Sequence, residues 1–244
     1  MPLLSCVCKS VNHVWEQLDQ GIAYCLNCPA VSGMGHSGNC MNPFDFFERK
    51  VCLTLGPDWP QMCSELERVG ITDAWRFDAI PDIGPHQSFS RSVRQILDDF
   101  MVSGSKTLLH LEDDCIFQPL DHLSLALSEL PENWDIVYLG ANLLCWGHAT
   151  DPQPERFSRH LFRVRQAWCT HAIGFNRKVV PFILENQPDF SAQMIDNWIS
   201  AQLPRLNAYV VAPMVVYQRA RHSSIWGRYD DYTPIFKQSE AKLI

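Results

Sequence analysis

From Lys50 onward, short apolar segments alternate with amphipathic helical segments, and this alternation constrains the fold more than any other feature. Strands are predicted at 51–55, 74–77, 134–140, 167–175, 209–212 and 214–218, and a further strand is predicted to run from Lys106 into the carboxylates at 112–114. Helices are predicted at 59–69, 88–103, 120–130, 176–185 and 191–203. Pro181 is expected to end or bend the helix in which it falls. Repetition of strand, helix and strand implies an α/β sheet covered by helices. The tail from Arg219 is polar and aromatic, and no element is predicted there.

Length and composition favour one main domain with an attachment. The chain has 244 residues, of which 46% are hydrophobic and 19% charged, which suffices for one sizeable core. The formal net charge of −7 disfavours a protein that binds nucleic acid by covering phosphates with Lys and Arg. No apolar run reaches the ~18 residues of a membrane span, and no signal peptide is recognisable. We therefore expect a cytoplasmic protein.

One predicted strand runs directly into three consecutive carboxylates, in KTLLHLEDDCIF from Lys106 to Phe117. In an open α/β sheet, ligands bind beyond the carboxyl ends of strands, where these charges fall. Strand alternation places Glu112 and Asp114 on one side and Asp113 on the other, so two carboxylates can converge on one cation. Mg²⁺ and Mn²⁺ prefer carboxylate and phosphate oxygens, so the segment predicts a metal that bridges protein and diphosphate. The alternative is an acidic, solvated loop.

Several segments, taken in order, resemble the motifs of family 25 glycosyltransferases, the lipooligosaccharide and collagen galactosyltransferases. They are LLHLEDDCIF, WDIVYLG, CTHAIGFNRKVVPFILE, MIDNWIS and APMVVYQRARHSSI, with VCLTLGPDW and SFSRSVRQIL upstream. The likeness spans about Val51 to Ile225 and rests mostly on order and spacing. This chain lacks the arginines that follow the family's first strand, and Ser90-Arg91 replaces the family's Ser-His pair.

The resemblance implies a GT-A-like (Rossmann-like) mixed sheet, a nucleotide-diphosphate sugar donor, most simply a UDP-sugar, and Mn²⁺ or Mg²⁺. It makes Asp114 the principal metal ligand with Glu112 in support, and it places Asp113 near the donor sugar or ribose, with a share in catalysis. His222 would complete the metal site, unless it is a surface residue beside a basic pair. Donor contacts are expected from Leu55, Asp58, Asp78, Arg91, Glu112, Asp113 and Arg221.

Inverting transfer to a hydroxyl acceptor needs a general base, and Asp196 in MIDNWIS is the candidate, with Trp198 nearby to stack on a sugar. The alternative is that Asp196 has no catalytic role and is an exposed residue of a helix, beside a Trp that packs in the core. Arg219, Arg221 and Arg228 either clamp phosphate oxygens or solvate the tail. The acceptor is expected to be a glycan or another hydroxyl compound; a hydroxymethylated pyrimidine of DNA is an alternative that the acidic charge disfavours.

Cysteines gather in the first 40 residues, so 1–48 is expected to be a Cys-rich segment ahead of a transferase domain at 49–244. Cys25, Cys28, His36 and Cys40 have a spacing within the span of small zinc sites, and Cys6 and Cys8 are alternative ligands to His36. A structural Zn²⁺, free thiols and a disulfide all remain open. Four later cysteines lie singly in apolar segments and are expected in the core: Cys52, Cys115, Cys145 and Cys169.

Two other functions fit the same residues. A non-catalytic module could hold a sugar or nucleotide while a zinc-stapled N-terminus contacts a partner. A metal-dependent phosphohydrolase or nuclease could use the same carboxylates, but such sites usually need a further Asp or His cluster for a second metal, and the sequence shows none.

Overall fold

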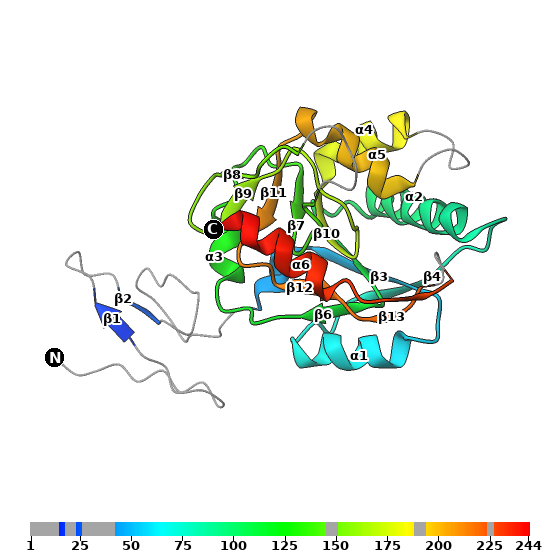
Figure 1. Cartoon of the computed structure of the whole chain (residues 1–244), viewed down its shortest axis with the longest axis horizontal. Helices are drawn as coiled ribbons and strands as arrows, with labels where there is room; N and C mark the ends of the chain where they lie inside the picture. The colour runs from blue at the N-terminus through cyan, green and yellow to red at the C-terminus, as the bar shows by residue number, and fades with distance from the viewer. Residues whose placement is uncertain (1–14, 18–22, 26–41, 145–150, 188–193, 224–226) are drawn as a thin grey trace.

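The computed structural model describes residues 15–17, 23–25, 42–144, 151–187, 194–223 and 227–244. Its centre is an eight-stranded sheet in the order β4-β3-β5-β10-β7-β11-β9-β8 (Figure 1). In chain order these strands are β3 Arg49–Thr54, β4 Trp75–Asp78, β5 Thr107–Glu112, β7 Ile136–Tyr138, β8 Glu155–Arg156, β9 Leu161–Arg163, β10 Ala172–Asn176 and β11 Ala208–Val211. The sheet is mixed and flanked by helices, as the sequence predicts.

Strand direction brings several strand ends to one edge of the sheet. β3 is parallel to both β4 and β5, and β7 is parallel to β11. β10 runs antiparallel between β5 and β7, so these two neighbours share a direction. Thr54, Glu112 and the residues after Tyr138 therefore meet at the same edge, where the start of β10 also lies.

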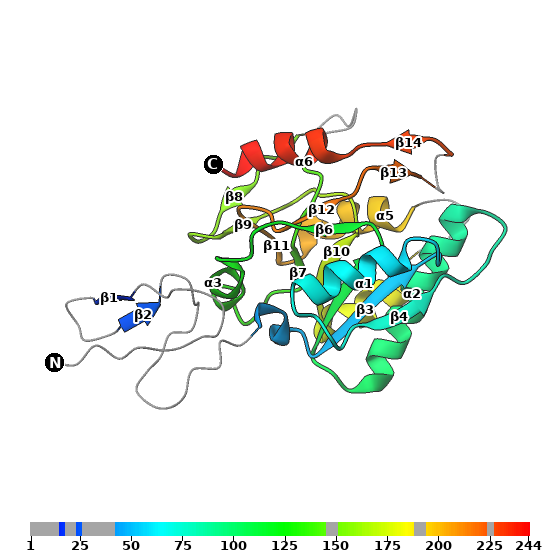
Figure 2. The ribbon, with the colours of Figure 1, turned by 90° about the horizontal axis from the view of Figure 1, so that it is seen from below.

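Helices cover both faces of the sheet, as Figures 1 and 2 show. They are α1 Trp59–Arg68, α2 Pro85–Ser103, α3 Leu123–Ser128, α4 Val180–Asn186, α5 Ile195–Gln202 and α6 Thr233–Glu240, with short 3₁₀ turns at Pro43–Phe46, Arg177–Val179, Leu203–Arg205 and Ala241–Leu243. Strand alternation divides the core in two. Leu108 of β5 packs with α2, α4 and α5, whereas the next residue, Leu109, packs with α1 and α3.

Local sequence explains where the site-forming helices begin and end. In α2, Val93, Ile96, Leu97 and Phe100 are buried at helical spacing, and Gly104 ends the helix with a left-handed φ of 78°.

The expectation for Pro181 is wrong. Pro181 lies in the first turn of α4, where its missing N–H has no helical partner to lose.

Smaller sheets complete the described chain. The strand predicted from Lys106 ends at the carboxylates as β5, a turn at Asp113 and Asp114 follows, and β6 (Cys115–Phe117) then pairs with β12 (Val216–Gln218). The tail is more ordered than expected, because β13 (Arg221–His222) pairs with β14 (Tyr229–Asp230) ahead of α6. Near the N-terminus, β1 (Trp15–Gln17) pairs with β2 (Ala23–Cys25).

The cysteine expectations are met only in part. Cys52 and Cys115 are buried free thiols, whereas Cys169 is free but partly exposed, and Cys145 lies outside the described residues. In the part of the chain that the structure describes, no helix is both long enough and apolar enough to cross a membrane.

Candidate functional site

Two neighbouring cavities open at the edge where the strands end. The larger has a volume of about 340 Å³ and the smaller about 120 Å³. Phe89, Glu112 and Arg221 line both, so these three side chains form the boundary between them. The position agrees with the rule that α/β sheets bind ligands beyond the carboxyl ends of their strands.

The guanidinium of Arg221 ties together the acidic residues of this boundary. Its Nη1 lies 2.7 Å from Asp58 Oδ2 and 2.8 Å from Asp113 Oδ1, and its Nη2 lies 3.0 Å from Asp114 Oδ2. Asp113 also accepts hydrogen bonds at Oδ2, from Thr54 Oγ1 at 2.6 Å and from the Leu55 backbone N–H at 3.1 Å. A cationic side chain of the tail thus screens the charges of the acidic turn.

The three acidic neighbours lie differently toward the two cavities. Asp114 lines the larger cavity, Asp113 lines the smaller one, and Glu112 lines both. Burial, reinforced by the charge of Asp114, raises the pKa of Glu112 well above its usual range, and Thr170 Oγ1 donates a hydrogen bond to Glu112 Oε1 at 3.0 Å. Burial also raises the pKa of Asp114, against the opposing pull of Arg221.

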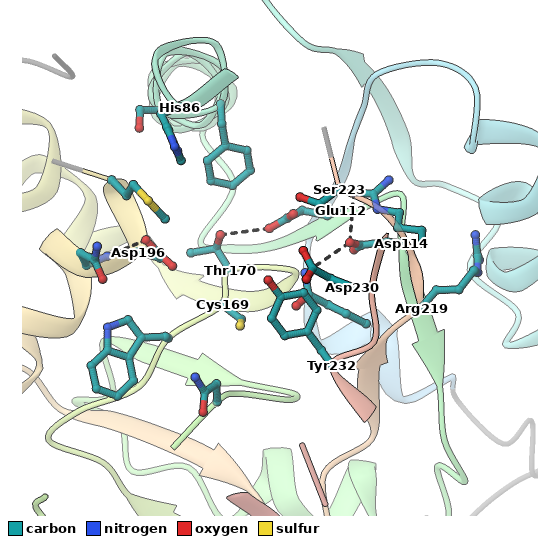
Figure 3. Close-up of a pocket in the computed structure, with 18 residues that line it drawn as sticks. His86, Glu112, Asp114, Cys169, Thr170, Asp196, Arg219, Ser223, Asp230 and Tyr232 are labelled. Carbon is teal, nitrogen blue, oxygen red and sulfur yellow. Dashed lines mark hydrogen bonds and ion pairs between the residues drawn. The ribbon is translucent and has the colours of Figure 1, made fainter. Parts of the chain in front are cut away.

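Asp196 lies on the other side of the larger cavity, in the first turn of α5 (Figure 3). Burial raises its pKa, while the backbone N–H groups of Asn197 and Cys169 donate to its carboxylate and partly oppose that rise. The bond from Asn197 N to Asp196 Oδ1 is 2.7 Å. Cys169 has a φ of 71°, the one positive value at a non-glycine residue in the described chain. Such strain is typical of functional sites.

Two helices begin beside the cavities. The first turns of α2 contribute His86 and Phe89, and the start of α5 contributes Met194 as well as Asp196. The free N–H groups and the dipole of a helix N-terminus favour an anion. Figure 3 shows the pair formed by Thr170 and Glu112 between Asp196 on one side and Asp114 on the other.

The residues predicted for the donor do not all gather here. Leu55 lines the smaller cavity, and Asp58 reaches the boundary through Arg221. Asp78 and Arg91 line neither cavity. Asp78 is exposed and paired with Arg76, and Arg91 is exposed and paired with Asp82 on the surface of the protein.

Two residues predicted for the site from the C-terminal part of the chain, His222 and Trp198, line neither cavity. His222 is exposed and lines neither cavity, because alternation in β13 directs it away from its neighbours Arg221 and Ser223, which do line the larger one. Trp198 is a correction: it packs in the core beside Phe182 and lines neither cavity, so it is not placed to stack on a sugar there.

The predicted metal fits these residues poorly. Among the described residues, no three His, Cys, Asp or Glu side chains gather as metal ligands. Asp114 Oδ1 is buried without a hydrogen-bond partner in the described chain and is the one oxygen of that carboxylate left open. Of the suggested zinc ligands, Cys28, His36 and Cys40 lie outside the described residues, and only the backbone of Cys25 is described.

Sequence reasoning missed Thr170 and Cys169, which lie in the segment before β10 beside the end of β5. It also missed Asp230 and Tyr232, which line the larger cavity from the tail. The motif CTHAIGF carried a signal for the first pair, since polar residues just before an apolar strand can face a neighbouring strand end. Nothing comparable marked the tail.

No family model matches the chain, and no curated protein is similar to it in sequence. A solved structure of A197 from STIV superimposes with a TM-score of 0.50 and 15% identity, covering 71% of this chain and 86% of that one. A glycosyltransferase involved in the glycosylation of the major capsid of PBCV-1 gives 0.41 and 11%, covering 66% and 80%. Mannose-1-phosphate geranyltransferase from Thermus thermophilus gives 0.40 and 10%, covering 75% and 74%.

At such identities, the likeness to A197 from STIV is one of fold alone. The mixed sheet flanked by helices is the arrangement that the GT-A-like expectation describes. Membership of family 25 stays a prediction from the sequence.

Proposed function

We propose that this protein is a glycosyltransferase that moves a sugar from a nucleotide-diphosphate sugar to a hydroxyl acceptor with inversion. One observation carries the proposal: a buried carboxylate with a raised pKa, Asp196, shares one cavity with the arginine and carboxylate cluster at the end of β5. A base and a phosphate-binding region on opposite sides of one cavity are what such a transfer needs.

The donor would lie across the boundary between the cavities. Its ribose would lie at the smaller cavity, beside Thr54, Leu55 and Asp113, where carboxylate and backbone groups can bind ribose hydroxyls. Its diphosphate would lie near Arg221 and Arg219, with the first turn of α2 close by. A UDP-sugar is the donor that the sequence resemblance favours.

The sugar and the acceptor would share the larger cavity. Trp168 and Tyr232 line it, and aromatic walls of this kind suit sugar rings, which have apolar faces. An acceptor hydroxyl that approaches Asp196 would lie on the side of the sugar opposite the leaving diphosphate. This arrangement favours inversion and a glycan acceptor.

The proposed reaction balances as one displacement. The acceptor oxygen forms a bond to the anomeric carbon of the sugar while the bond from that carbon to the donor phosphate oxygen breaks. The acceptor proton passes to the Asp196 carboxylate, and the nucleoside diphosphate leaves with the bonding electron pair. The developing negative charge on its terminal phosphate is offset by cationic groups at the boundary.

Replacement of the proposed base tests this function. Asp196→Asn keeps the shape of the side chain but removes its basicity, so kcat for sugar transfer is expected to fall by about 100-fold or more with little change in KM for the donor. Asp99→Asn, on the exposed side of α2, is the matched control. Unchanged kcat in the Asp196 variant would contradict the proposed role.

A further inference from the structure

We propose that the Arg221 guanidinium is the cation of the donor site, and that sugar transfer therefore proceeds without a divalent metal. This inference rests on the proposed function, since it names what neutralises the donor diphosphate. It departs from the Mn²⁺ or Mg²⁺ that the acidic turn and the family resemblance lead one to expect.

The first support is that the acidic turn already has its cation. Arg221 contacts Asp58, Asp113 and Asp114 at distances from 2.7 to 3.0 Å, within the range of charge-assisted hydrogen bonds. These contacts join residues more than 100 positions apart in the sequence, since Arg221 lies 108 positions after Asp113. They therefore depend on the tertiary fold.

The second support is that three of the four carboxylate oxygens of Asp113 and Asp114 are engaged, while Asp114 Oδ1 is open. Asp113 Oδ1 accepts from Arg221, and Asp113 Oδ2 accepts from Thr54 and Leu55. Asp114 Oδ2 accepts from Arg221 and, at 3.2 Å, from Gln218 Nε2. A metal ion coordinated by both Asp113 and Asp114 would therefore have to break several of these hydrogen bonds.

The third support is charge. A divalent ion at Asp113 and Asp114 would lie within a few ångströms of the guanidinium, and like charges that close repel, the more so where burial reduces screening by water. Moving Arg221 away instead would leave a partly buried cation, 24% exposed, without its three partners. Both routes oppose metal entry.

The arginines retain donors for a ligand. A guanidinium carries five N–H groups, and Arg221 lines both cavities, so unengaged N–H groups at the boundary can meet phosphate oxygens. Arg219 lines the larger cavity, and its buried Nη1 has no hydrogen-bond partner among the described residues. Two arginines can therefore offset the charge that the leaving diphosphate acquires.

The test compares nucleoside diphosphate release by donor hydrolysis, in which water accepts the sugar, by the full-length chain in excess EDTA and in Mn²⁺. The substrates are UDP-glucose, UDP-galactose, GDP-mannose and TDP-glucose. The rate in EDTA is expected to stay within about threefold of the rate in Mn²⁺, whereas a required metal ion is worth several kcal/mol and its removal would lower the rate by more than ~100-fold.

Substitutions of Arg221 then test whether its guanidinium is the cation that offsets the charge of the donor diphosphate. Arg221→Gln is expected to lower the EDTA rate by about 100-fold or more, and Arg221→Lys to recover part of the loss, because it keeps the charge but not the planar fork. Arg94→Gln, at a partly exposed arginine of α2 that lines neither cavity, should leave the rate unchanged. If Arg221→Gln does not fold, the wild-type comparison alone decides.

The outcomes separate the two proposals. Turnover in Mn²⁺ that disappears in EDTA overturns the arginine proposal and leaves the transferase function standing. Absence of turnover in both conditions with every donor overturns both proposals. Equal rates for wild type and Arg221→Gln in EDTA also overturn the role of Arg221.

Discussion

Two carboxyl groups on opposite sides of the larger cavity, Asp114 and Asp196, differ in what surrounds them. Asp114 is bound to Arg221, so its charge is matched within the protein. Asp196 accepts hydrogen bonds from backbone N–H groups, and burial raises its pKa against the opposing effects of those bonds and of the charge of His86. Burial thus raises the pKa of both carboxyl groups, and in Asp114 the charge of Arg221 opposes that rise.

The rate of transfer should depend on pH through Asp196. A base acts only when it is deprotonated, and burial raises the pKa at which that occurs. Activity should therefore rise with pH, with an acidic limb centred above the ordinary Asp value of about 3.9. A profile of kcat against pH checks this expectation. In Asp196→Asn the residual rate should lose that limb, and an identical limb in the variant would assign it to another group.

At the scale of residues, the sequence predicts which side chains belong to the site better than it predicts which side chains they contact. The acidic turn and Asp196 follow from local pattern, and the structure places both at one cavity. The contact of Arg221 with Asp58 joins residues 163 positions apart, and no local pattern could reveal it. His222 was favoured over its neighbours because its side chain can bind metal, but β13 turns it outward.

At the scale of elements, hydrophobic periodicity predicts those elements that bury an apolar face. Periodicity located α2, and strand patterning located β3, β5 and β11 to within a few residues. The pairing of β13 with β14 and the helix α6 escaped prediction because their sequence is polar and mixed. Tertiary contacts hold α6: Glu240 accepts hydrogen bonds from Met214 N at 2.7 Å and Tyr217 Oη at 2.8 Å.

The approach of β12 to the end of β7 depends on Gly140. A Cβ atom added there would lie 1.8 Å from the carbonyl oxygen of Val216, which is backbone and cannot turn aside. Gly140→Ala is therefore expected to lower the free energy of unfolding by about 2 kcal/mol or more. Urea unfolding measures the difference.

Gly84→Ala is the matched control for this variant, since its added methyl group meets only the flexible side chain of Gln87. It should cost much less stability than Gly140→Ala. If the two variants unfold at the same urea concentration, the backbones of β7 and β12 do not approach as closely as the structure places them.

At the scale of the whole molecule, the sheet brings together parts of the chain that lie far apart in sequence. The end of β3, the end of β5, the start of α5 and the tail supply one pair of cavities. Short strand and helix patterns predicted the α/β class, but the position of β10 between β5 and β7 comes from long-range pairing. That pairing places Thr170 beside Glu112, and the site depends on it.

The most direct test of nucleotide-sugar binding is a thermal-shift screen of the full chain with UDP-, GDP-, CMP- and TDP-sugars. A ligand that binds only the folded state at 100 times its Kd stabilises by about 2.7 kcal/mol, or roughly 5 to 10 °C for a chain of this size. We predict such a rise for one nucleotide class, with UDP-sugars favoured. A melting temperature that no nucleotide sugar raises, with or without Mn²⁺, would contradict the proposed function.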